Sequence, residues 1–259
     1  MAVLEFIPMI FIQWVFMVCF VCSSLGLGTL SLTCDPNDLL VLKEFAGNLT
    51  DGSIIPAWAN ESICCQWVGV KCGNGINGSA ARRVIMLMLP SRGLKGMITR
   101  SLGNLDQLKL LDLSHNFLEG GIPTGLSNLH HLELLDLSFN MLMGPISGSL
   151  SGLKSIHLIN ISSNSFGGNI VELGDFRNLV VFNVSNNSLT GKVDNRICSS
   201  SSSIQILDLS ANNFSGGLSE ESLQNCSTSL KQLHVDCNSF SGHLPDTVFV
   251  VIFGAAFNL

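Results

Sequence analysis

Three aspartates recur at one place of an internal repeat and are the first candidates for chemistry. Asp112 and Asp136 lie 24 residues apart, and Asp208 stands at the same place of a later repeat. Paired carboxylates can perform acid–base catalysis, as in glycoside hydrolysis. Because these aspartates recur with the repeat, we interpret them as a solvated row on a strand surface. The sequence contains no HExxH, P-loop, GxSxG, HRD or DFG string, so we predict no enzyme activity, metal site or cofactor.

The nine cysteines form a second candidate set. We expect disulfide bonds between Cys34 and Cys64, between Cys65 and Cys72, and between Cys198 and Cys226. The sequence does not fix the connectivity, and zinc binding by the first four cysteines is the alternative, which an oxidising compartment disfavours. Cys237 is left over, and we expect a partly buried thiol there, with pairing between chains as the alternative.

Eight asparagines head N-x-Ser/Thr triplets and are predicted glycosylation sites, which favours secretion. They are Asn48, Asn60, Asn77, Asn160, Asn183, Asn186, Asn213 and Asn225. Asn160 and Asn183 occupy the same repeat position as Asp112. Sugars there would crowd the middle of the surface and leave its margins for a protein ligand, whereas unmodified asparagines would continue the polar row.

The elements that position these residues follow from a repeat. The stretch 108–131 returns as 132–155, with Leu111, Leu113 and Asn116 recurring 24 residues later. Self-similarity at about 20 to 29 residues with the pattern LxxLxLxxN is typical of a leucine-rich repeat solenoid. The pattern is visible seven times and should alternate leucines into the core of short strands, with each asparagine at the turn.

The second half of each repeat carries an LxGxIP pattern, clearest at 118–123 and 240–245. This pattern resembles the plant-specific class of leucine-rich repeats, which adds a second short strand after the asparagine turn. We therefore predict an α/β solenoid: a plant-type, right-handed leucine-rich repeat coil with a parallel β-sheet on its concave face and an N-terminal helical cap held by disulfides. Each coil should depend on its neighbours for burial of its apolar face.

Composition and segment patterns divide the chain into four parts. Residues 1–26 resemble a secretory signal peptide, with an uncleaved anchor as the alternative; residues 27–83 form the cap, residues 84–246 the repeats, and residues 247–259 an apolar tail that is too short to span a bilayer. The net charge of −6 argues against a nucleic-acid partner. In the cap, Asp35, Pro36 and Asp38 should start a helix.

The strings CDPNDLLVLKEFAGNL, SICCQWVGVKC and LKLLDLSHNFLEG resemble the phytosulfokine receptor family of plant leucine-rich repeat receptor kinases. The resemblance implies an N-terminal ectodomain part of such a receptor, secreted or on the outer side of the plasma membrane. It implies a peptide or protein ligand, with a co-receptor as a second candidate partner. Full-length relatives continue through a hormone-binding island, a membrane helix and a kinase, and none of these motifs occurs in this sequence.

Five residues are modest candidates for partner binding: Asp112, His115, Asp136, Phe139 and His234. The alternative is that they are ordinary exposed strand residues. Two other functions stay open, a secreted inhibitor that resembles plant polygalacturonase inhibitors and a non-functional truncated product. An open last repeat also predicts self-association.

Overall fold

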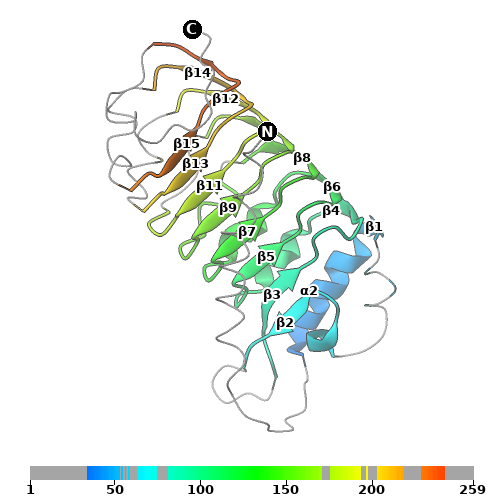
Figure 1. The fold of residues 1–259 in the computed structure, drawn as a ribbon. Helices are drawn as coiled ribbons and strands as arrows, with labels where there is room; N and C mark the ends of the chain where they lie inside the picture. Colours follow the sequence, from blue (N-terminus) through cyan, green and yellow to red (C-terminus); the bar gives the residue numbers. More distant parts are fainter. Residues whose placement is uncertain are drawn as a thin grey trace. The chain divides into compact units, whose positions relative to one another are not determined.

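Seven parallel strands at the leucine-rich positions form one continuous sheet, which we call sheet A (Figure 1). They are β3 (Val84–Met88), β5 (Leu110–Asp112), β7 (Leu134–Asp136), β9 (Leu158–Asn160), β11 (Val181–Asn183), β13 (Ile206–Asp208) and β15 (Gln232–His234). The cap strand β2 (Val70–Cys72) pairs antiparallel with β3 and completes the sheet. The register aligns equivalent repeat positions, since Leu111 pairs with Leu135 and Leu135 with Ile159. The predicted parallel solenoid sheet is confirmed.

The computed structural model describes residues 34–52, 54, 56, 58, 63–74, 81–146, 148–170, 176–193, 197, 203–218 and 229–242. The predicted signal peptide and the apolar tail lie outside these residues. So do Cys198 and Cys226, and the glycosylation candidates Asn60, Asn77 and Asn225.

A second sheet, sheet B, forms from the LxGxIP half of the repeats. Its order along the solenoid is β1 (Leu49–Asp51), β4 (Lys95–Met97), β6 (Phe117–Gly120), β8 (Met141–Pro145), β10 (Ser165–Gly168), β12 (Ser188–Gly191), β14 (Asn213–Gly216) and β16 (Ser239–Phe240). A glycine with positive φ, such as Gly120 at 78° and Gly191 at 87°, ends four of these strands, β6, β10, β12 and β14. Glycine adopts this left-handed conformation without a steric penalty. The second strand expected for the plant-type repeat is therefore present.

Leucines and asparagines hold neighbouring coils together. Leu111 and Leu113 are fully buried, as are their counterparts in the next coil. The amide of Asn140 donates to the carbonyl oxygen of Leu113 in the preceding coil at 3.0 Å, and its Oδ1 accepts from the backbone N–H of Leu118 at 3.0 Å. The same bonds recur at Asn164, Asn187, Asn212 and Asn238. These side chains satisfy backbone groups that would otherwise be buried without partners.

The cap consists of helix α2 (Pro36–Gly47), strand β1, the short helix η1 (Cys64–Gln66) and strand β2. The Asp35 carboxylate accepts from the backbone N–H groups of Asn37 and Asp38, as expected for an N-cap. The structure contains disulfide bonds between Cys34 and Cys64 and between Cys65 and Cys72, the two pairings expected for the cap. These disulfide bonds explain why the sulfur atoms of Cys34, Cys64 and Cys65 lie as close together as the ligands of a metal ion would.

A buried ion pair joins the cap to the first repeat. Asp38 is completely buried and accepts two hydrogen bonds from the Arg83 guanidinium, at 2.9 and 3.1 Å. Its Oδ2 also accepts from the backbone N–H of Val84, at the start of β3, at 2.7 Å. Bonding to Asp38 raises the pKa of Arg83. The sequence suggested only a helix-start role for Asp38, so this link to the repeats is a finding of the structure.

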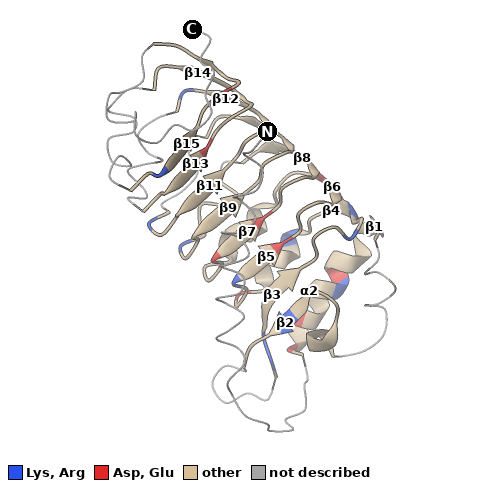
Figure 2. Ribbon diagram, viewed as in Figure 1, with Lys and Arg blue, Asp and Glu red and all other residues tan. Residues whose placement is uncertain are grey.

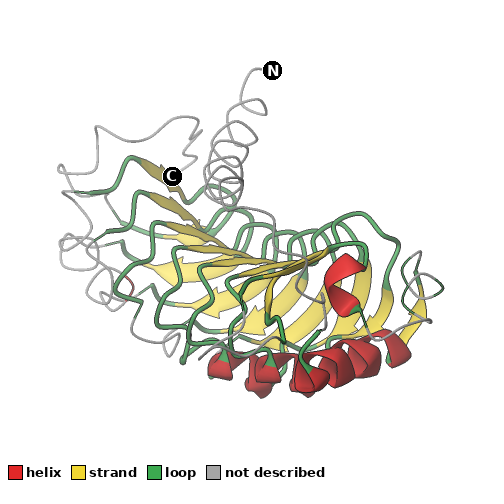
Figure 3. Ribbon diagram, turned by 90° about the horizontal axis from the view of Figure 1, so that it is seen from below, coloured by secondary structure: helices red, strands yellow, loops and turns green. Residues whose placement is uncertain are grey.

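Short helices lie along one side of the coils, away from the strands of the two sheets (Figure 3). The 3-10 helices η3 (Arg100–Asn104) and η4 (Thr124–Asn128) stack on each other. A Cβ atom at Gly103 would lie 1.9 Å from the carbonyl oxygen of Gly125. Glycine is therefore required where these two turns meet.

Candidate recognition surface

The outward residues at the end of each sheet A strand form a polar row. Its members are Asp112, Asp136, Asn160, Asn183, Asp208 and His234, and each pairs in register with the next. Figure 2 shows the acidic positions on β5, β7 and β13. Because side chains alternate across a strand, these residues point away from the leucine core. The row is thus continuous across six neighbouring strands, as the repeat period predicted.

Serines two residues further on fix the orientation of the polar row. The Oδ1 atom of Asp112 accepts from the backbone N–H of Ser114 at 3.0 Å and from its hydroxyl at 2.7 Å. The same pair of bonds occurs at Asp136, Asn160, Asn183 and Asp208. Among the described residues, the Oδ2 atoms of Asp112 and Asp208 accept no hydrogen bond. Each of these oxygens can accept one from a ligand.

Asp136 differs from the solvated residue that we expected. It is 4% exposed, and its Oδ2 accepts from the amide of Asn160 at 3.2 Å. The pKa of Asp136 is raised to about 6, mainly by burial and in smaller part by the nearby Asp112 carboxylate, while hydrogen bonds from Ser138 and Asn160 partly oppose the rise. The expectation of an exposed partner-binding residue is wrong at this position. Packing of the adjacent strands encloses this carboxyl group.

A second row on the same face is aliphatic, and our reading of the sequence missed it. Its members are Met86, Leu110, Leu134, Leu158, Val181 and Ile206, which pair in register from β3 to β13. Met86 and Leu110 are buried but stand apart from the leucine core cluster, while the other four are partly exposed. Alignment of the repeats on Leu111 would have revealed this row, because one variable position is aliphatic in six consecutive coils.

The five candidate partner-binding residues do not form one cluster. Asp112 and Asp136 are register neighbours on β5 and β7. The rings of His115 and Phe139 stack with centroids 4.3 Å apart, at the turns that lead toward sheet B. His234 lies at the other end of sheet A, on β15. We therefore treat the first pair as part of the polar row and the stacked pair as part of a different surface.

Comparison with known proteins identifies the repeat. The family "Leucine rich repeat N-terminal domain" matches residues 35–73, and "Leucine Rich Repeat" matches residues 107–129, 131–153 and 203–226. Phytosulfokine receptor 2 of Arabidopsis thaliana is 58% identical over 200 residues, which is 77% of this chain. The chain belongs to the plant leucine-rich repeat receptor kinases and resembles the phytosulfokine receptors among them. It spans 19% of the length of that relative.

Solved receptor ectodomains share the fold of this leucine-rich repeat chain. The crystal structure of PEPR1–AtPEP1 matches with a TM-score of 0.73 and 28% identity, covering 83% of this chain and 30% of that one. The Arabidopsis receptor kinase HAESA, solved in complex with the peptide hormone IDA and the co-receptor SERK1, matches with a TM-score of 0.71 and 26% identity. That match covers 83% of this chain and 36% of HAESA.

The glycosylation candidates fall into two groups in this receptor-type solenoid. Asn48, Asn186 and Asn213 are exposed, and the last two stand at or beside strands β12 and β14 of sheet B. Asn160 and Asn183 are only partly exposed in the polar row, where their Oδ1 atoms accept from serine. Glycosylation at all five described positions stays a prediction.

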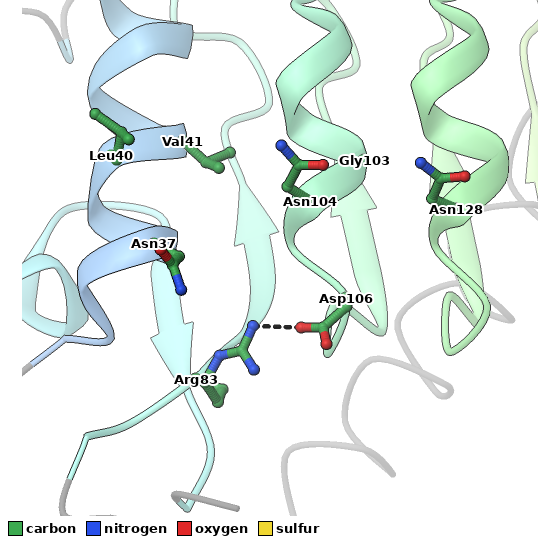
Figure 4. Close-up of a pocket in the computed structure, with 8 residues that line it drawn as sticks. All are labelled: Asn37, Leu40, Val41, Arg83, Gly103, Asn104, Asp106 and Asn128. Carbon is green, nitrogen blue, oxygen red and sulfur yellow. Dashed lines mark hydrogen bonds and ion pairs between the residues drawn. The ribbon is translucent and has the colours of Figure 1, made fainter.

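One pocket lies where the cap meets the first repeats (Figure 4). Its lining residues are Asn37, Leu40, Val41, Arg83, Gly103, Asn104, Asp106 and Asn128. Arg83 pairs with Asp106 across it as well as with Asp38. Since its charged residues are paired with one another, we assign this pocket to the junction rather than to a ligand.

Two further expectations concern thiols and membranes. Cys237 is a free and exposed thiol, so the expectation of partial burial is wrong. Its backbone has φ of 52° at the turn before Asn238, a position that points the side chain outward in the other coils too. Among the described residues, no helix is long and apolar enough to cross a membrane.

Proposed function

We propose that this chain is an extracellular recognition module that binds a peptide or protein through sheet A and has no catalytic activity of its own. The observation that carries the proposal is the pair of parallel rows, one aliphatic and one polar, which lie side by side on the five adjacent strands from β5 to β13. Relatives of this chain are receptor kinases, and similar ectodomains are solved with peptide ligands. A co-receptor is a second candidate partner, because HAESA is solved with the co-receptor SERK1 as well as with a peptide hormone.

The chemistry of the two rows defines the ligand class. The aliphatic row offers apolar area, whose burial contributes about 25 cal/mol per Å². The polar row offers carboxylate oxygens at Asp112 and Asp208 that have room for a donor. An extended peptide with aliphatic side chains and a lysine or arginine therefore fits this face. An anionic group such as a sulfate would meet like charge on the polar row.

The test is a binding measurement with two synthetic peptides on the purified 259-residue chain, produced in a host that adds no N-linked sugars, because asparagine at position 112 or 208 would head a new N-x-Ser triplet. In one peptide leucine alternates with arginine, and in the other leucine alternates with glutamate. We expect the arginine peptide to bind at least about tenfold more tightly by calorimetry, a difference of about 1.4 kcal/mol. The double variant Asp112→Asn with Asp208→Asn should remove most of this preference. Asp51→Asn is the matched control, because Asp51 is an exposed carboxylate on sheet B and pairs with Lys95.

Equal binding of both peptides, or an unchanged preference in the double variant, would contradict the proposal. The inhibitor alternative makes a different prediction for the same material. If the secreted chain inhibits a microbial polygalacturonase tightly while neither peptide binds, the receptor-type function is wrong. A sulfated peptide of the phytosulfokine type should bind no better than its unsulfated form, because its sulfate gains nothing from the acidic row.

A further inference from the structure

Sheet B carries an exposed apolar patch in its N-terminal part that the recognition proposal for sheet A does not use. The sheet B patch consists of Met97, Phe117, Phe139, Met141 and Met143, each between 51% and 55% exposed. These side chains come from the adjacent strands β4, β6 and β8 and from the turn before β8. His115 extends the patch by stacking on Phe139. Contiguous exposed apolar side chains of this kind mark interaction sites in soluble proteins.

The fold itself does not require apolar residues at these positions. The strand position held by Phe117 and Met141 is serine at Ser165 and Ser188 in the next two coils. These serines are exposed, and their strands β10 and β12 continue the same sheet with parallel pairing. The outward side chains of the patch are therefore not needed for coil stacking. Their place on three consecutive coils calls for a different explanation, namely contact with another molecule.

A single charge at the centre of the patch indicates the chemistry of its partner. Glu119 is exposed and lies in register between Met97 on β4 and Met141 on β8. Within the described part of the chain Glu119 makes no ion pair, whereas Lys95 at the edge pairs with Asp51 at 3.0 Å. The patch thus combines a ring of apolar side chains with one carboxylate that is free to pair.

This arrangement disfavours a second copy of the chain. A two-fold symmetric contact places the same surface on both subunits. Centred on the patch, it would bring two Glu119 carboxylates together, and like charges repel when water is excluded. We propose that the sheet B patch binds a partner protein whose apolar surface carries a lysine or arginine that pairs with Glu119. This surface is separate from sheet A, so either proposal can fail without the other.

The experiment uses the 259-residue chain, produced in a host that adds no N-linked sugars and then immobilised, and three amphipathic helical peptides as probes. The peptides share a leucine- and phenylalanine-rich face and differ only at its central position, which is lysine, glutamine or glutamate. We expect the lysine peptide to bind about tenfold more tightly than the glutamate peptide. Glu119→Lys should reverse this order, because the charge at the centre of the patch is inverted. The double variant Phe117→Ser with Met141→Ser should weaken the binding of all three peptides by about tenfold or more.

The controls separate this surface from sheet A and from misfolding. The two serines are the residues that later coils carry at the same repeat position, so the double variant should keep the wild-type melting temperature. Asp112→Asn with Asp208→Asn, the sheet A variant, should leave the preference among the helical peptides unchanged. The matched variant Ser188→Ala on β12 should have no effect. Loss of the lysine preference in the sheet A variant, or its persistence in Glu119→Lys, would overturn the proposal.

Sedimentation gives an independent outcome. We expect the wild-type chain and the Phe117→Ser with Met141→Ser variant to show the same state of association at micromolar concentration. A dimer that disappears in the Phe117→Ser with Met141→Ser variant would show that the patch binds a second copy, and the proposed basic partner would then be wrong.

Discussion

The two halves of the solenoid use the same backbone in different ways. The N-terminal half, from the cap to β8, contains two disulfides, the buried pair of Asp38 and Arg83, and the exposed sheet B patch. The C-terminal half, from β9 to β16, presents small polar residues on sheet B and carries two exposed glycosylation candidates, Asn186 and Asn213. Its repeats also bury large aromatic side chains, whereas the buried aromatics of the N-terminal half lie in the cap.

This difference shows which features the repeat fixes and which it leaves open. Phe166, Phe182 and Phe214 fill core positions of the C-terminal half that leucines fill in the N-terminal half. The asparagine ladder, which is the row of asparagines from Asn116 to Asn238 that bond to the preceding coil, is common to both halves. Outward positions are free to differ because the packing of the leucine core does not depend on them. We infer that covalent and ionic links stabilise the end of the solenoid at the cap, whereas the described residues of the later coils are held together by stacking and by the asparagine bonds between coils.

The largest expected effect comes from breaking the link between cap and repeats. Asp38→Ala removes a fully buried carboxylate and leaves the Arg83 guanidinium and the Val84 N–H without their partner. Removing one member of a buried ion pair costs about 3–5 kcal/mol of folding stability. Chemical denaturation of the purified chain should show this loss. Asp51→Ala breaks the exposed pair with Lys95 and should leave the unfolding midpoint unchanged.

If Asp38→Ala unfolds at the same denaturant concentration as the wild-type chain, the N-terminal half is not anchored by this pair. The contrast between the halves would then rest on the disulfides alone.

The second-largest effect is expected from removing one asparagine of the ladder in each half. Asn116→Ala and Asn212→Ala each remove a buried amide that donates to three carbonyl oxygens and accepts from a backbone N–H. Leaving such groups unsatisfied costs about 2–3 kcal/mol. Because each coil contacts only its neighbours, amide exchange should accelerate mainly in the coils that flank the substitution. Asn128→Ala, an exposed asparagine in η4, is the control with an effect below about 0.5 kcal/mol.

In Asn212→Ala, we expect the region of accelerated amide exchange to extend over several coils toward the C-terminal end of the solenoid. In Asn116→Ala, we expect it to extend less far toward the cap. Equal spreading in both directions would contradict the view that the cap anchors its half.

Much of this fold could be predicted because the repeat imposes it. The period of the leucines determined the strands of sheet A, and Asn140 and its equivalents occupy the predicted turns. The resemblance of the LxGxIP pattern to plant-type repeats implied a second strand in each coil, and these strands form sheet B. These features depend on short-range spacing, which the sequence displays directly.

The remainder depends on contacts between residues that are distant in the sequence. Asp38 and Arg83 are 45 residues apart, and nothing in their local surroundings indicates that they meet. The burial of Asp136 results from packing by adjacent strands, whereas the equivalent Asp112 stays partly exposed. The sheet B patch escaped notice because its members are spread over three repeats at positions that vary elsewhere.

A smaller effect should appear in the pH dependence of folding stability, and its source is Asp136 in the N-terminal half. The pKa of Asp136 is raised by burial from its ordinary value of 3.8 to about 6. A carboxyl group with a raised pKa binds its proton more tightly in the folded state than in the unfolded state. Its contribution to stability is therefore complete below about pH 4, decreases as the pH rises to about 6, and is constant above that. The change should amount to roughly 1–3 kcal/mol.

Asp136→Asn should flatten the stability profile between about pH 4 and pH 6, measured by thermal unfolding of the unglycosylated chain at a series of pH values. Asp208→Asn is the matched control at the same repeat position in the C-terminal half, where the side chain is partly exposed and bonds only to Ser210. It should retain the wild-type slope. If Asp208→Asn flattens the profile and Asp136→Asn does not, burial is not the cause of the pH dependence.

The smallest effect concerns Cys237, the exposed thiol near the end of the C-terminal half. Its side chain occupies the outward turn position that holds Ser163 and Ala211 in earlier coils, so it contributes little to stacking. Cys237→Ser should change the free energy of unfolding by less than about 0.5 kcal/mol. In the native wild-type chain this thiol should react rapidly with a thiol reagent, and the variant should lose that fast phase. A slow reaction with a large loss of stability in Cys237→Ser would mean that the last coils are more tightly packed than the contrast between the halves implies.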